Sequence, residues 1–315
     1  MKVLFVSSGN KGIINPLIKA QIDSLLQIDK QNIDIDTYLI KGQGLAGYLR
    51  NINPLRKVVK NGNYNCIHAH YSFSGIVASL GGSKPVITSL MGSDINKNKF
   101  YKFVAKIFVR YFWAHTIVKS NDMAIPFPEG KVTVIPNGVD IAKFTLMNRE
   151  QACKEVGWNR SKTHITFAAN PSRPEKNFQL ADTAFKFVSK RLDNLELHIL
   201  ENVPHKKIPI FINASDVVVL SSKWEGSPNV IKEAMACNRP IVCTDVGDVS
   251  WLFGNEEGHF ISSHDVNDFS EKLEECIIYS KNKSKTNGRN RILELKLDSE
   301  SVAKRIIAIY DKFSQ

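Results

Sequence analysis

The stretch "WEGSPNVIKEAMACNRPIV" (residues 224–242) decides the fold of the second half of this chain. The run before it, "DVVVLSS" (216–222), is typical of a buried strand. Ser227 then stands where a helix cap is expected, Pro228 at the first helical position, and good helix formers follow. A strand, a polar loop and a capped helix in this order predict one βα unit of a parallel sheet.

Two glutamates lie on either side of the start of this expected helix. Glu225 is in the loop before it, and Glu233 shares a helix flank with Asn229, four residues earlier. The free amides of a helix start attract anions, and Gly226 lets a ligand approach the backbone closely. The pattern therefore favours a ligand with a central diphosphate and hydroxyls at both ends, a nucleotide sugar. The alternative is two solvated glutamates, as most glutamates are.

Short β-rich runs alternate with amphipathic stretches along the whole chain, which predicts an α/β protein with two Rossmann-like, doubly wound parallel-sheet domains. The pattern restarts after a segment with turn residues, "KVTVIPNGVDIAKF" (131–144). We expect an N-terminal acceptor-binding domain over 1–143, a nucleotide-sugar-binding domain over 144–298, and a C-terminal helix over 299–315 that packs back on the first domain. Ligands of such sheets bind at the carboxyl ends of the strands, so we expect the active site in a cleft between the domains.

The charge of the chain favours anionic partners. Its 42 Lys and Arg exceed 31 Asp and Glu, for a net charge of +11. We expect no nucleic acid, because no aromatic and basic sheet motif is present. Five cysteines without paired metal spacing, no secretory leader and no long apolar run predict a cytoplasmic protein.

The glutamate pair within "EGSPNVIKEAMACNRPIV" (225–242) resembles the signature of the retaining glycosyltransferases of family 4, also called group 1, which have the GT-B fold. "IPNGVD" (135–140) and "MGSDI" (91–95) resemble further motifs of that family. The resemblance implies that Glu225 binds the donor sugar and Glu233 the ribose hydroxyls. It also implies that the amides of one short segment receive the phosphate oxygens: Gly226, Ser227, Pro228 and Asn229.

The loop "NPSRPEKNFQLA" (170–181) resembles the family segment that brings an Arg and a Lys to the leaving diphosphate. Lys176 matches the family position, whereas Arg173 stands two residues late. Both are predicted to stabilise the leaving group, because a guanidinium fork clamps phosphates well. The alternative is a pair of solvated loop cations.

In the first half, Gly9 and Gly12 in "SSGNKGIINP" (7–16) are candidates for close donor approach, and a plain turn is equally consistent with them. His70, which shares a strand face with His68, is expected to contact the acceptor or to pack.

The segment "TSLMGSDI" (88–95) supplies two further candidates for acceptor or sugar contacts. Met91 stands where the family commonly has a histidine that touches the donor sugar. Asp94 binds the acceptor or caps the following helix.

Residues 98–113 predict an amphipathic helix with Lys99, Lys102, Lys106 and Arg110 along one stripe and aromatic residues opposite. Such a helix lies on an anionic membrane or packs as a core helix whose lysines reach to solvent.

The sequence thus predicts a retaining glycosyltransferase that uses a nucleoside-diphosphate sugar, a saccharide or lipid-linked saccharide acceptor, and neither a metal nor a cofactor. Cell-surface polysaccharide or glycolipid synthesis is the expected process, with peripheral contact to the membrane. The alternatives are a sugar-nucleotide epimerase of the same fold and an inactive nucleotide-sugar-binding module.

Overall fold

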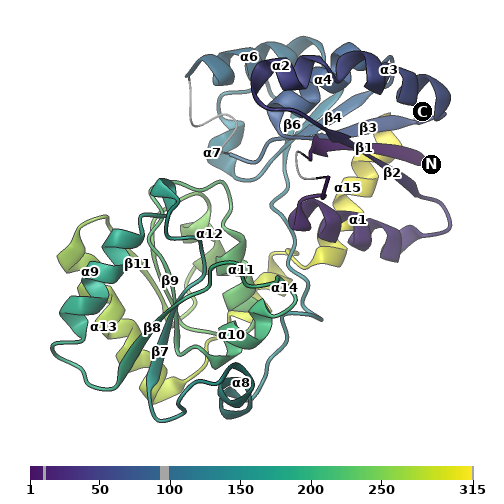
Figure 1. Cartoon of the computed structure of the whole chain (residues 1–315). Helices are drawn as coiled ribbons and strands as arrows, with labels where there is room; N and C mark the ends of the chain where they lie inside the picture. Colours follow the sequence, from purple (N-terminus) through teal and green to yellow (C-terminus); the bar gives the residue numbers. More distant parts are fainter. Residues whose placement is uncertain (10–11, 93–98, 314–315) are drawn as a thin grey trace. The chain divides into compact units, whose positions relative to one another are not determined.

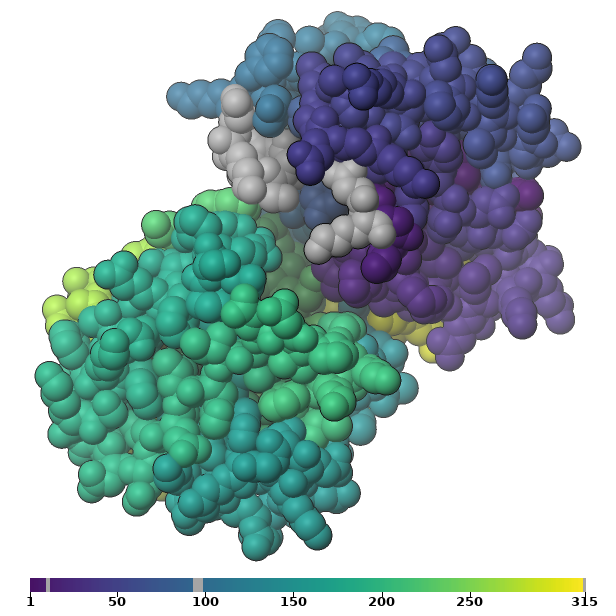
Figure 2. Space-filling view, in the orientation of Figure 1, coloured from purple at the N-terminus to yellow at the C-terminus, as the bar shows by residue number. Residues whose placement is uncertain are grey.

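A computed structural model describes residues 1–9, 12–92 and 99–313. The chain divides into two compact units, Met1–Gly138 with Ser299–Gln315, and Val139–Asp298 (Figure 1). Each unit is an α/β sandwich of its own, as the alternating pattern predicts, and Figure 2 shows one face of both units in a space-filling view.

Unit 1 contains a parallel sheet of six strands in the order β2-β1-β3-β4-β5-β6. Its elements are β1 (Lys2–Ser8), α1 (Pro16–Asp29), β2 (Asp34–Ile40), α2 (Gly44–Leu49), α3 (Ile52–Asn61), β3 (Cys66–His70), α4 (Ser72–Gly81), β4 (Val86–Ser89), α6 (Lys99–Tyr111), β5 (His115–Val118), α7 (Asn121–Ala124), β6 (Val132–Val134) and α15 (Ser299–Phe313).

Unit 2 contains a parallel sheet of five strands in the order β11-β10-β9-β7-β8. Its elements are α8 (Arg149–Val156), β7 (Thr163–Phe167), the short 3₁₀ helix η1 (Pro174–Lys176), α9 (Phe178–Val188), β8 (Leu195–Ile199), α10 (Ile208–Ala214), β9 (Val217–Leu220), α11 (Asn229–Ala236), β10 (Ile241–Thr244), α12 (Val249–Phe253), β11 (His259–Ser262), α13 (Val266–Lys283) and α14 (Gly288–Glu294).

Helices cover both faces of each sheet, which explains the uninterrupted apolar strands. Every residue of β3, β4, β5, β7, β9 and β10 is buried, as expected where a parallel sheet is packed on both sides. In unit 1, α3, α4 and α6 cover one face, and α1 and α15 the other. In unit 2, α9 and α13 lie opposite α11, α12 and α14.

The C-terminal helix α15 belongs to unit 1 and completes its core. Val302, Ile306 and Tyr310 are buried in one cluster with residues of β1 and α1. The hydroxyl of Tyr310 hydrogen-bonds Nδ1 of His68 on β3 at 2.5 Å. Residues at the two ends of the chain therefore form one core.

Two edge strands, β6 and β11, were not predicted from the sequence. The three residues of β6 lie just before the turn residues around Pro136. Because of these turn residues, the whole segment 131–144 was predicted to be a linker. β11 has four residues and pairs with β10. Short edge strands carry little periodicity, so only their neighbours in the sheet identify them.

Candidate functional site

The carboxyl ends of β7 and β9 lie side by side in unit 2, although β8 separates them in the sequence. The strand order reverses between these two strands, and ligands of open α/β sheets bind at such a switch point. The loop after β7 contains Lys176 and the loop after β9 contains Glu225. Ser221 joins the loops, because its hydroxyl donates to the carbonyls of Lys176 and Asn177 at 3.1 and 3.0 Å.

Lys176 and Glu225 form an ion pair at this switch point, with 2.5 Å between Nζ and Oε1. Their side chains are 14% and 17% exposed, so water screens the pair only in part. The hydroxyl of Ser222 donates to the same Glu225 oxygen at 2.8 Å. The sequence therefore identified two residues that the tertiary structure places in contact.

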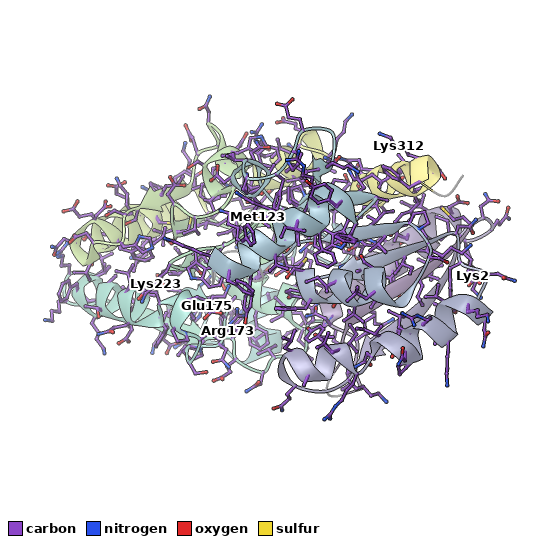
Figure 3. The ribbon with its side chains drawn as sticks, turned by 90° about the horizontal axis from the view of Figure 1, so that it is seen from above. Lys2, Met123, Arg173, Glu175, Lys223 and Lys312 are labelled. Atoms are coloured by element: carbon purple, nitrogen blue, oxygen red, sulfur yellow. The ribbon has the colours of Figure 1, made fainter. Side chains whose placement is uncertain are left out.

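Arg173 is turned to a carboxylate of its own loop. It donates from Nε and Nη2 to Oε1 of Glu175 at 3.0 and 2.7 Å, and its side chain is 53% exposed. The backbone amide of Lys223 donates to the Glu175 carbonyl at 2.8 Å, so this loop is tied to the one after β9. Figure 3 shows Arg173, Glu175 and Lys223 next to one another.

Helix α11 begins one residue later than the sequence predicts. Pro228 is its N-cap and Asn229 its first residue, so the prediction of a Ser227 cap was wrong. The hydroxyl of Ser227 instead accepts a hydrogen bond from Nζ of Lys232 at 2.9 Å. The local sequence, a serine followed by a proline, is typical of a helix cap. In the structure the serine oxygen accepts from a buried lysine and caps no backbone amide of α11.

Lys232 is a residue of α11 beside the site that was not predicted from the sequence. Its side chain is fully buried, and this burial lowers the pKa of Lys232 to about 8 although the nearby Asp248 and Glu233 raise it. Burial likewise raises the pKa of Asp248, against the effect of the Lys232 charge. In a sequence, a lysine on a helix is expected to be solvated, and only the packing of α11 against the loop after β10 shows otherwise.

That loop contacts the residues before α11 through Gly247. The φ of Gly247 is +64°, and a Cβ there would lie 2.6 Å from the carbonyl oxygen of Gly226. Only glycine allows this approach, which holds the backbone of 225–227 in place.

Glu233 is 9% exposed and lies on the flank of α11. Nε2 of His205, in the loop between β8 and α10, lies 3.1 Å from its Oε1. Nδ1 of His205 lies 2.6 Å from Nζ of Lys143, whose segment precedes α8. His205 was not predicted as a site residue, since its loop, "ENVPHKKIP" (201–209), shows no pattern that points to Glu233.

In unit 1 the strand order reverses between β1 and β3, and a pocket of about 500 Å³ lies at the carboxyl ends of these strands. It is lined by residues of the β1–α1 loop and of the β3–α4 connection, among them Ser8, Gly9 and Tyr71. A Cβ at Gly9 would lie 2.6 Å from that of Leu39, so packing already requires a glycine there. Gly12 has a φ of +69° and open space around it, which indicates a turn.

His70 and His68 share a face of β3, as predicted, and both are buried. Their rings stack with 4.4 Å between centroids. His68 bonds Tyr310 and Ser89, whereas the ring nitrogens of His70 have no hydrogen-bond partner among the described residues. Burial lowers the pKa of His70 to about 3, with a smaller effect from Lys119.

Of the two candidates after β4, Met91 is half-buried directly beyond the strand. Asp94 lies outside the described residues. The structure therefore places Met91 near the carboxyl edge of the unit 1 sheet.

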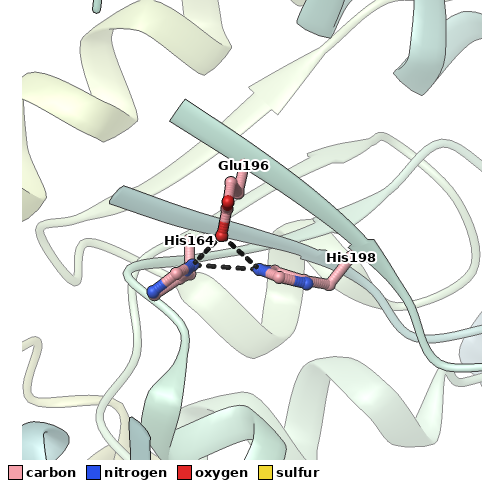
Figure 4. A group of neighbouring side chains, drawn as sticks. All are labelled: His164, Glu196 and His198. Atoms are coloured by element: carbon pink, nitrogen blue, oxygen red, sulfur yellow. Dashed lines mark hydrogen bonds and ion pairs between the residues drawn. The ribbon is translucent and has the colours of Figure 1, made fainter. Parts of the chain in front are cut away.

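Among the described residues, one group of side chains has the composition of a metal site: His164, Glu196 and His198 (Figure 4). Nδ1 of His164 lies 2.9 Å from Nε2 of His198, and Lys162 pairs with Glu196 at 2.6 Å. Its residues lie within β7 and β8, and none of them belongs to the loops after β7 and β9 that form the switch point.

Comparisons with known proteins identify the family that the chain resembles. The family model "Glycosyl transferases group 1" matches residues 181–291, and "Glycosyltransferase Family 4" matches residues 29–143. The chain is 27% identical over 278 residues to "UDP-Gal:alpha-D-GlcNAc-diphosphoundecaprenol alpha-1,3-galactosyltransferase" of Escherichia coli, covering 75% of this chain and 72% of that protein. It is 24% identical to a "D-inositol 3-phosphate glycosyltransferase" of Pseudarthrobacter chlorophenolicus, covering 73% of this chain and 66% of that protein.

Solved structures show the same fold over nearly the whole chain. A sucrose-phosphate synthase from Thermosynechococcus elongatus superposes with a TM-score of 0.80 at 14% identity, covering 99% of this chain and 98% of that one. Anabaena Alr3699/HepE in complex with UDP-glucose gives 0.74 at 17% identity, covering 99% and 100%. In the part of the chain that the structure describes, no helix has the length and apolar character to cross a membrane.

Proposed function

The chain belongs to the group 1 glycosyltransferases and has the GT-B fold, and from this premise we propose that it transfers a sugar from a nucleoside-diphosphate sugar to an acceptor hydroxyl with retention of the anomeric configuration. The observation that supports this activity most directly is the Lys176–Glu225 pair beside the start of α11. It places a cation, a carboxylate and the start of a helix at one switch point, which suits a diphosphate bound to a sugar.

In this proposal the negative charge that grows on the departing diphosphate is stabilised by Lys176, by the amides at the start of α11, and by Arg173 once it leaves Glu175. Preorganised charge of this kind is usually the largest contribution to catalysis, and loss of one such group costs about 10²–10³ in kcat. Glu225 orients the sugar hydroxyls, which its carboxylate can accept as hydrogen-bond donors.

Glu233, held by His205, is proposed to bind the ribose hydroxyls. Its carboxylate is nearly buried, so the local dielectric is low. Hydrogen bonds from the two ribose hydroxyls to this carboxylate are therefore stronger than they would be in water. The cations of the site supply the charge that a metal would otherwise bring, and we propose a metal-independent reaction. We give the His164, Glu196 and His198 group no part in it, since these residues lie within β7 and β8 and outside the loops of the switch point.

The acceptor is proposed to be a saccharide, or a lipid-linked saccharide, in the synthesis of a cell-surface polysaccharide or glycolipid. The name of the Escherichia coli relative specifies a diphosphoundecaprenol-linked substrate, and the Anabaena protein was solved with UDP-glucose bound. We further propose that this reaction takes place at the cytoplasmic face of a membrane and that the protein binds there peripherally.

The first experiment is a thermal-shift panel of nucleoside diphosphates and their sugars. A ligand raises the free energy of unfolding in proportion to ln(1 + [L]/Kd), so the correct base is the one that stabilises most. Lys176→Ala and Glu233→Ala should lose most of this stabilisation. Lys186→Ala, which removes an exposed lysine paired with Asp182 on α9, is the matched control and should behave as the wild type.

Product analysis with the best donor then separates the alternatives. Transfer to an added saccharide acceptor supports the proposal. A changed nucleotide sugar without any acceptor would identify an epimerase, and tight binding without transfer or hydrolysis would identify an inactive module. If no nucleotide stabilises the protein, the proposal is wrong.

A further inference from the structure

Unit 1 contains a second pocket, which the proposed chemistry does not use. It has a volume of about 320 Å³, and α2, α4 and α6 enclose it. These helices lie together on one face of the sheet (Figure 1). The pocket is within the size range of small-molecule sites, and its lining is almost entirely apolar, including Leu45, Ile76, Val104 and Phe108.

This apolar pocket shares a wall with the pocket at the β1–β3 switch point. Tyr48 and Phe73 line both, and their ring centroids are 5.4 Å apart. A molecule that has its polar end at the carboxyl edge of the sheet can therefore extend its apolar end past these two rings.

The outer face of α6 is unusually apolar for a helix in water. Phe100, Phe103, Ile107 and Tyr111 follow one helical stripe and are 64%, 59%, 37% and 69% exposed. A core helix would bury this stripe, yet only Ala105 and Val109 of α6 are buried. An exposed apolar stripe on a surface helix indicates a binding partner.

The composition of the segment that contains these helices indicates which kind of partner fits. Residues 37–121 contain twelve Lys and Arg and a single Asp. Within α6, Lys99, Lys102, Lys106 and Arg110 accompany the aromatic stripe, and no acidic residue is present. Aromatic side chains among cations are typical of helices that lie on anionic lipid surfaces.

The backbone is strained two residues before Phe73 of the shared wall. Tyr71, the residue before α4, has a φ of 73° and a ψ of 149°, a region that only glycine adopts easily. Such a conformation costs about 1–3 kcal/mol and is found mainly at functional sites. It places Tyr71 in the lining of the switch-point pocket.

We propose that the apolar pocket binds the hydrocarbon chain of a lipid-linked, phosphate-bearing acceptor, while the saccharide occupies the neighbouring switch-point pocket. The chain enters from the membrane along the aromatic face of α6. This inference rests on the proposed function for the identity of the reaction and specifies the class of acceptor.

The test measures binding of farnesyl monophosphate to the full-length protein below the micelle concentration of this lipid, by calorimetry. Geranyl monophosphate, one isoprene unit shorter, and inorganic phosphate are the comparison ligands. Each buried methylene contributes about 0.8 kcal/mol, so the farnesyl compound should bind at least about tenfold more tightly than the geranyl one, and inorganic phosphate should bind far more weakly than both.

Leu45→Glu, at an exposed position of the lining, should weaken farnesyl binding at least about tenfold because it puts a charge beside the chain. Leu80→Glu is the matched control, since Leu80 is exposed on α4 and outside the lining, and it should bind as the wild type does. Val104→Trp, which fills the pocket, should act as Leu45→Glu does.

Equal affinity for the two isoprenoids, or unchanged binding by Leu45→Glu, would overturn the proposal. A concentration-dependent dimer that Leu45→Glu dissociates would also overturn it, because a second copy would then cover this face. The nucleotide thermal shift of the same variants is measured in parallel. If the nucleotide shift is present but farnesyl monophosphate does not bind, only the lipid-pocket proposal is rejected. If the wild type shows no nucleotide shift, the proposed function itself is rejected.

Discussion

Lys176 and Glu225 are 49 residues apart in the sequence and in direct contact in the structure, with Nζ and Oε1 separated by 2.5 Å at the β7–β9 switch point. In the proposed reaction, a phosphate oxygen of the donor competes with Glu225 for the ammonium group of Lys176. In the protein without ligand, the cation that we propose to bind phosphate is therefore paired with a carboxylate of the same site.

Glu225→Gln is expected to bind the nucleoside diphosphate a few-fold more tightly, because roughly 1 kcal/mol of ion-pair energy no longer opposes binding. Transfer should be slower, since the sugar loses its carboxylate partner. Calorimetry and initial rates measure the two effects. Glu274→Gln, which removes the partner of Arg191 on the surface, should change neither, and weaker nucleotide binding in Glu225→Gln would contradict the expectation.

Glu233 is predicted to account for the preference for ribose. The wild type should bind the preferred nucleoside diphosphate about tenfold more tightly than its 2′-deoxy form, the effect of one unmet buried hydrogen bond. Glu233→Ala should bind the two forms alike, and His205→Ala should reduce the preference in part. A preference that persists in Glu233→Ala would place the ribose elsewhere.

The buried Lys232 predicts a stability change in alkaline solution. Its folded pKa of about 8 lies below the ordinary lysine value of 10.5, so between these values the unfolded chain binds more protons than the folded one. The free energy of unfolding should therefore rise across this interval, by about 3 kcal/mol at most. Denaturant unfolding of Lys232→Met at pH 8 and 10 should lack this rise, and equal slopes in both proteins would show that the lysine is not buried.

Six of the eight histidines have lowered pKa values because they are buried, among them His70 and His259, both at about 3, and His198 at about 4. The folded state then binds fewer protons than the unfolded chain below pH 6.5. The free energy of unfolding is therefore not reduced by these histidines above pH 6.5, and it declines as the pH falls towards 4.

His259 allows this acid prediction to be tested at a single position. His259→Phe keeps a ring against Phe253, which stacks on His259 at 4.6 Å, and should show a shallower decline in acid than the wild type. Unfolding by urea between pH 7 and 4.5 measures the slopes. The same slope in both proteins would contradict the assignment for this residue.

Tyr310 connects the last helix to the first sheet. Tyr310→Phe removes the hydroxyl and leaves Nδ1 of His68 buried without its partner, at a cost of about 1–3 kcal/mol. Thermal unfolding should show a lower midpoint. Tyr279→Phe, which removes an exposed hydroxyl bonded to the Lys285 carbonyl, is the control and should have little effect.

Local spacing explains what could be predicted. The alternation of apolar strands and amphipathic helices requires only neighbours in the chain, so the two Rossmann-like sheets could be predicted, and the structure confirms them. The predicted cap of α11 was wrong because the oxygen of Ser227 accepts a hydrogen bond from Lys232. Lys232 is buried by tertiary packing, which the local sequence does not indicate.

The sequence by itself determined the fold class, the family motifs and which residues are candidates, because these depend on patterns within a few turns or strands. Only the tertiary structure decided that Lys176 pairs with Glu225, that His205 contacts Glu233, and that Tyr48 and Phe73 line two neighbouring pockets. These contacts depend on the order of strands in a sheet. That order results from the packing of whole elements, and no short stretch of sequence specifies it.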